Sequence, residues 1–87
     1  MIHVNAKTSI HRIPLDLLVL NDCTLWNFQK LEELYKELQK WPEGDLDPIQ
    51  VKAATPGVRY AVIDGRHRTT AYRMARRNDI LAVVVHG

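Results

Sequence analysis

The sequence predicts a compact α+β domain with a small mixed sheet and two main helices. An amphipathic pattern begins after Asn27, and two strand-like runs flank the turn signal TPG at residues 55–57. A third observation is a segment with helical spacing at 66–77, followed by the apolar run ILAVVV at 80–85. A strand, a helix and a second strand in this order form one crossover unit, which indicates a sheet with both parallel and antiparallel pairs.

Length and composition fit one domain spanning residues 1–87. The chain has 87 residues, of which 46% are hydrophobic and 25% are charged, and it contains no linker-like or repetitive segment. Its apolar runs are too short to cross a membrane, and no leader-like segment follows Met1, so we expect a cytoplasmic protein that does not contact membranes. The single cysteine, Cys23, fits a small buried residue.

The N-terminal half contains short strand patterns and one clear helix pattern. We expect strands at 2–4 and 10–13, and a turn or short helix at 15–20. Asn27 can cap a helix that ends near Trp41, before Pro42 and Gly44. The apolar positions of this helix recur at spacings of three and four, and the nearby aromatic residues are predicted to lie in the core: Trp26, Phe28, Tyr35 and Trp41.

The C-terminal half is predicted to form a hairpin, a helix and a closing strand. Residues 48–54 and 58–63 are the two hairpin strands, and 80–85 is apolar enough to be buried on both faces. In the helix at 66–77, one stripe is expected to face the sheet, namely His67, Ala71, Met74, Ala75 and Asn78. The outward side is expected to carry Arg66, Thr70, Arg73 and Arg77.

Basic residues gather in one segment although the formal net charge is only +2. Five of the twelve lysines and arginines lie between residues 64 and 77, where Asp64 is the one acid, whereas most acids lie between 32 and 47. The protein should therefore have a basic face and an acidic face. Arg73, Arg76 and Arg77 are candidates for contact with nucleic-acid phosphates, the alternative being a solvated basic surface.

The turn around Gly65 is the strongest candidate site. A helix that starts there leaves backbone N–H groups without partners, and a glycine lets a phosphate approach the backbone. Arg66, His67 and Arg68 can supply side-chain donors, and hydroxyls can come from Thr69 and Thr70. The alternative is a purely structural turn, with solvated arginines, a hydrogen-bonded His67 and Asp64 as a helix cap.

The segment PIQVKAATPGVRYAVIDGRHRTTAYRMA, followed by ILAVVV, resembles the N-terminal domain of ParB partition proteins and the wider ParB/sulfiredoxin superfamily. The ParB signature is Gly, acid, Arg, Arg, any residue, Arg, Ala, and Gly65, Arg68 and Ala71 match it. The sulfiredoxin signature is Gly, Cys, His, Arg, and Gly65, His67 and Arg68 match it.

This resemblance implies a nucleotide-binding domain in a DNA partition or regulatory context. The turn binds the phosphates of CTP in partition proteins and of ATP in sulfiredoxin, so Gly65, Arg66, His67 and Arg68 inherit that role, with Mg²⁺ accompanying the nucleotide. The implied partners are the nucleotide, DNA or a DNA-binding domain, and a second copy in a homodimer. Sulfiredoxin activity is not expected, because Arg66 replaces the nucleophilic cysteine and Cys23 lies in an unrelated stretch.

Three other functions compete with this interpretation. A ParB-like nuclease would use His67 as general base and Asp64 as a metal ligand. A nucleotide-dependent kinase of a small molecule would need a carboxylate base, and an interaction domain would have lost its ligand. The remaining histidines, His3, His11 and His86, show no metal-ligand spacing, so no zinc site is expected.

Overall fold

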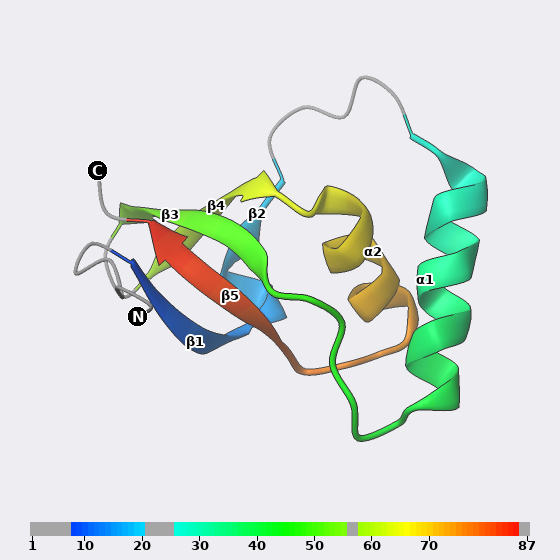
Figure 1. Cartoon of the computed structure of the whole chain (residues 1–87). Helices are drawn as coiled ribbons and strands as arrows, with labels where there is room; N and C mark the ends of the chain where they lie inside the picture. The colour runs from blue at the N-terminus through cyan, green and yellow to red at the C-terminus, as the bar shows by residue number, and fades with distance from the viewer. Residues whose placement is uncertain (1–7, 21–25, 56–57, 86–87) are drawn as a thin grey trace, which may run out of the picture.

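The two helices and the strands around them follow in the predicted order in the computed structural model, which describes residues 8–20, 26–55 and 58–85 (Figure 1). The elements are β1 (Thr8–Pro14), the 3₁₀ helix η1 (Leu15–Leu17), β2 (Leu18–Val19), α1 (Phe28–Lys40), β3 (Ile49–Thr55), β4 (Arg59–Asp64), α2 (Arg66–Met74) and β5 (Asp79–Val85). The predicted α+β class is therefore confirmed. The strand expected at 2–4, the TPG turn beyond residue 55, and Cys23, His3 and His86 lie outside the described residues.

The five strands of the described part of the chain form one mixed sheet in the order β1-β5-β3-β4-β2. β1 with β5 and β3 with β4 pair antiparallel, whereas β3 with β5 and β2 with β4 pair parallel. The predicted hairpin is thus confirmed. The short strand β2, expected only as a turn or short helix, pairs with β4 and so lies at the edge beside the turn that leads into α2.

The two helices form layers beside the sheet, with α2 between the sheet and α1 (Figure 1). The start of α1 follows the prediction, because the Oδ1 atom of Asn27 accepts a hydrogen bond of 3.0 Å from the main-chain N–H of Lys30. The core is formed by alternate residues of the strands together with the inner faces of both helices. Its largest fully buried side chains are Tyr72, Ile49, Ile80, Val51 and Thr69.

The closing strand β5 is covered on one face only, which corrects the prediction of two buried faces. Ile80, Ala82 and Val84 are buried, whereas the residues between them are partly exposed. The helical layer packs on one side of this sheet, so the apolar side chains on the other side keep some contact with solvent (Figure 1).

The prediction that the aromatic residues near α1 form core is also wrong. Phe28 and Trp41 are 75% and 59% exposed, and Trp26 and Tyr35 are only partly buried. The buried aromatic residue is Tyr72 of α2, whose hydroxyl accepts from the N–H of Leu46 and donates to Asp45. Two hydrogen bonds for its hydroxyl allow the whole ring to be buried without leaving a polar group unsatisfied.

Helix α2 buries a different face than predicted, and it is shorter than predicted. Its buried residues are Thr69, Ala71 and Tyr72, whereas Met74 of the predicted inner stripe is 47% exposed. The helix ends at Met74 rather than at residue 77, because Arg76 adopts a left-handed conformation with φ of 58°. The N–H groups of Arg76 and Arg77 then bond the carbonyls of Arg73 and Tyr72, which is a Schellman ending.

No helix within the described ranges has the length and apolar character needed to span a membrane.

Candidate functional site

Gly65 connects β4 to α2 with a backbone conformation and a packing that exclude other residues. Its φ is +107°, and a Cβ atom built on it would lie 2.4 Å from Cγ2 and 2.7 Å from Cβ of Ile49. The missing side chain therefore faces β3, and the approach of an anion is not what requires a glycine here. The prediction from sequence attributed this glycine to the approach of a phosphate, whereas the structure attributes it to the packing against Ile49. Both reasons require glycine at residue 65.

The first turn of α2 carries no side-chain cap, and its N–H groups start the helix beside this glycine. The N–H and the hydroxyl of Thr69 both donate to the carbonyl of Gly65, at 2.8 and 3.0 Å. Thr69 is fully buried, and neither Thr69 nor Thr70 lines the neighbouring cavity. The hydroxyl of Thr69 therefore stabilises the turn, and the role of these two residues toward a phosphate stays a prediction.

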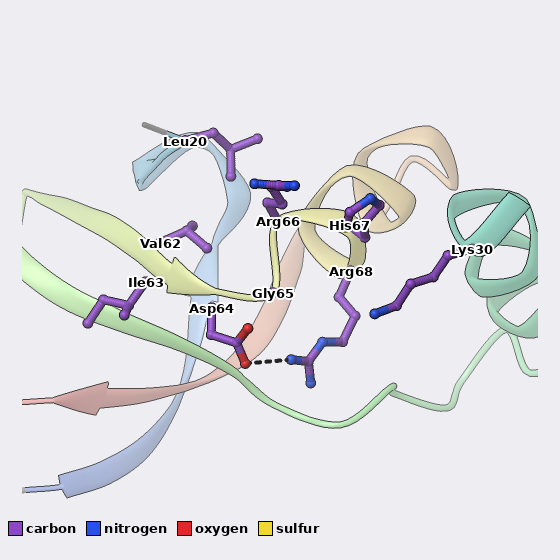
Figure 2. Close-up of a pocket in the computed structure, with 9 residues that line it drawn as sticks. All are labelled: Leu20, Lys30, Val62, Ile63, Asp64, Gly65, Arg66, His67 and Arg68. Atoms are coloured by element: carbon purple, nitrogen blue, oxygen red, sulfur yellow. Dashed lines mark hydrogen bonds and ion pairs between the residues drawn. The ribbon is translucent and has the colours of Figure 1, made fainter. Parts of the chain in front are cut away.

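A cavity of about 430 Å³ opens at this turn (Figure 2). It lies within the size range of small-molecule sites. Its walls come from the end of β4, the start of α2, the residue after β2, and α1. They comprise Leu20, Lys30, Val62, Ile63, Asp64, Gly65, Arg66, His67 and Arg68.

Lys30 is a charged lining residue that sequence reasoning missed, together with the apolar Leu20, Val62 and Ile63. It lies in the first turn of α1, which packs against α2, and its side chain extends toward the first turn of α2 (Figure 2). The cavity thus combines cationic side chains from two helices. Four of its lining residues carry donors suited to phosphate oxygens: Lys30, Arg66, His67 and Arg68.

Trp26, also missed as a site residue, supports Arg66 and His67. The Cζ atom of Arg66 lies 5.6 Å from the centroid of the Trp26 ring, which is within the range of a cation–π contact. The imidazole of His67 meets the same ring edge-on, with centroids 5.0 Å apart and planes at 70°. One indole therefore fixes the orientation of two cavity residues.

The imidazole of His67 is held as an acceptor. Its Nε2 atom accepts a hydrogen bond of 3.0 Å from the main-chain N–H of Asn27. Burial lowers the pKa of His67 below its ordinary value, and the positive charges of Arg66 and Lys30 lower this pKa further. The ring is therefore neutral at pH 7, with its basic lone pair already occupied. This geometry gives the role of general base no support, and that role stays a prediction.

Arg68 and Asp64 form a pair at the opposite side of the turn from Arg66 (Figure 2). The guanidinium of Arg68 donates to Asp64 at 3.3 Å and to the carbonyls of Asp47 and Pro48 at 3.1 and 3.0 Å. Arg68 therefore stabilises the loop before β3 as well as lining the cavity. The side chain of Asp64 is 67% exposed and does not cap the helix, and its predicted metal-binding role stays untested.

Two of the three arginines expected to meet nucleic acid bond the protein's own carbonyls. Arg73 donates to Leu15 and Leu18 at 3.3 and 3.1 Å. Arg77 donates to three carbonyls after or near the end of α1, those of Leu38, Trp41 and Gly44. Arg73 and Arg77 therefore stabilise the fold, whereas no such bond from Arg76 occurs among the described residues. Arg73 and Arg76 are exposed, and Arg77 is partly buried. Contact with nucleic acid stays a prediction.

The family model of the ParB N-terminal domain matches residues 1–86. The chain belongs to this family. No curated protein matches the sequence of this ParB N-terminal domain significantly.

Solved structures share the fold at low sequence identity. ParB from Caulobacter crescentus complexed with CTP-γ-S has 20% identity and a TM-score of 0.75, covering 91% of this chain and 45% of its own. Sulfiredoxin from Arabidopsis thaliana has 21% identity and the same TM-score, covering 91% and 86%. SbnI from Staphylococcus aureus has 24% identity and a TM-score of 0.66, covering 90% and 30%. This ParB N-terminal domain therefore spans less than half of the matched ParB chain.

Proposed function

We propose that this ParB N-terminal domain binds the phosphates of a nucleoside triphosphate in the cavity at Gly65. The observation that carries the proposal is that Lys30 and Arg66, from two different helices, both line the cavity at the uncapped start of α2. A helix N-terminus attracts anions through its N–H groups and its dipole, and two side-chain cations add charge at the same place.

Among nucleotides, CTP is the first candidate. The matched ParB of Caulobacter crescentus was solved with CTP-γ-S, and the same protein was also solved with its centromeric parS site. By this likeness, the domain works in DNA partition or regulation, and Mg²⁺ enters bound to the phosphates. The residues of this chain bind and orient the triphosphate; no hydrolytic step follows from their geometry.

Calorimetric titration with CTP, ATP and tripolyphosphate in the presence of Mg²⁺ tests this proposal. We expect saturable binding of CTP, and at least a tenfold loss of affinity in Lys30→Ala and Arg66→Ala, because each removes a charge-assisted contact worth about 1.5–3 kcal/mol. Lys36→Ala is the matched control, since Lys36 lies on the same helix and pairs with Glu32 away from the cavity.

The variants distinguish binding in the cavity from nonspecific electrostatic attraction. Equal losses in Lys30→Ala and Lys36→Ala would show that only net charge matters. The proposal would be overturned if none of the three ligands bound. Arg68→Ala is a poor test, because the guanidinium of Arg68 also bonds Asp47 and Pro48.

A further inference from the structure

His67 connects the cavity to Asn27, the N-cap residue of α1. The hydrogen bond from the N–H of Asn27 ends on Nε2, so this nitrogen cannot carry the proton of the neutral ring. The proton is therefore on Nδ1, and no other hydrogen bond of His67 occurs within the part of the chain that the structure describes. The main chain of Asn27 thus selects one tautomer and leaves Nδ1–H as a donor.

We propose that His67 is a positioning residue that relays phosphate binding to helix α1. Its Nδ1–H donates to the bound phosphate while Nε2 holds the N–H of Asn27, so that the ligand strengthens the attachment of α1 to α2. The inference rests on the proposed function. Its basis is that hydrogen bonds in a chain polarise one another: an imidazole that donates to an anion becomes a better acceptor at its second nitrogen.

The charges around His67 keep the relay in its neutral form. Arg66 from α2 and Lys30 from α1 line the same cavity as the ring, and the positive charge of each disfavours a second proton on it. Asp64, the acidic residue of the cavity lining, is paired with Arg68. The ring therefore has no nearby unpaired carboxylate in this lining that would favour an imidazolium, which would release Asn27.

The relay acts on a residue that controls the start of α1. Asn27 is the helix cap, and its side chain accepts the N–H of Lys30 over 3.0 Å. A firmer hold on the main chain of Asn27 therefore also fixes the turn that carries Lys30, which lines the cavity. Ordering one ligand-binding group through another reduces the entropy lost when the second group binds.

The tautomer can be measured without any ligand. Long-range ¹H–¹⁵N spectra of the free protein at pH 7.5 distinguish a protonated Nδ1 from a protonated Nε2. The relay predicts that His67 carries its proton on Nδ1. A proton on Nε2, or an imidazolium at this pH, would overturn the relay whatever the protein binds.

The coupling is measured by hydrogen exchange of the Asn27 amide with and without saturating CTP and Mg²⁺. We expect exchange about fivefold slower with CTP in the wild-type protein, the ratio that corresponds to strengthening by one ordinary hydrogen bond. His67→Asn places its amide near the position of Nδ1, so it should bind CTP within about fivefold of wild type but show no ligand-dependent change at Asn27.

His67→Gln is the complementary variant, because its amide reaches toward the position of Nε2. Its Asn27 amide should be protected without ligand, and its CTP affinity should fall by about fivefold or more. A ligand-dependent change at Asn27 that persists in His67→Asn would overturn the relay. Binding of CTP to the wild-type protein without a change at Asn27 would overturn the relay alone, whereas failure of CTP, ATP and tripolyphosphate all to bind would overturn the proposed function with it.

Discussion

The α-carbon of Gly65 packs so closely against Ile49 that any side chain at residue 65 would enter the space of β3. Gly65→Ala should therefore lower the free energy of unfolding by about 2–4 kcal/mol, from the clash together with the left-handed φ. Urea denaturation of the two proteins measures this difference. A loss below about 1 kcal/mol would mean that the turn does not depend on this packing.

Arg77 stabilises the end of α1 through hydrogen bonds to the carbonyls of Leu38, Trp41 and Gly44. We expect Arg77→Ala to lower the free energy of unfolding by about 2–3 kcal/mol, because charge-assisted bonds to helix-end carbonyls are lost. Arg76→Ala is the matched control and should change it by less than about 0.5 kcal/mol. Similar losses in the two variants would contradict the capping role of Arg77.

Arg76 occupies the left-handed position of the Schellman ending, where glycine is the usual residue. Arg76→Gly should raise the melting temperature slightly, by an amount that corresponds to about 0.5–1 kcal/mol, because the steric cost of φ at 58° is relieved. Thermal unfolding followed by circular dichroism measures this change. A lower melting temperature would show that the conformation is not strained.

Asp45 should make the free energy of unfolding decrease at acidic pH. The hydrogen bond from Arg12 lowers the pKa of Asp45, and the hydroxyl of Tyr72 adds to this effect. Because the folded pKa lies below the unfolded one, the contribution is complete above about pH 4 and is lost as the pH falls through the folded pKa. The free energies of unfolding of Asp45→Asn and wild type should differ by about 1 kcal/mol at pH 7 and converge once the pH falls below the folded pKa of Asp45. A constant difference would contradict this assignment.

Local signals in the sequence predicted most of the elements. The Asn27 cap and the spacing of three and four predicted α1, and two apolar runs around a turn signal predicted the hairpin of β3 and β4. The end of α2 was predicted less well, because its left-handed residue is Arg76 rather than glycine. The packing of β5 was also missed, since an apolar run indicates that a strand can be buried but not how many layers cover it.

The candidate site was predicted only where its residues are consecutive. The run from Asp64 to Arg68 lines the cavity as a unit because it forms one turn. Lys30 and Trp26 join this turn from about forty residues earlier in the chain, through the packing of α1 on α2. Nothing in their local spacing distinguishes Lys30 from Lys36, which pairs with Glu32 on the same helix.

Mapping of backbone amide shifts during a titration with CTP and Mg²⁺ tests the central claim most directly. If the triphosphate binds at the uncapped start of α2, the largest ¹H–¹⁵N shifts will fall on residues 65–69 and on Lys30, and in Arg66→Ala they will need at least a tenfold higher CTP concentration to reach the same extent. Shifts that cluster elsewhere, for example along the exposed face of α1, or saturating binding that leaves residues 65–69 unchanged, would contradict the account.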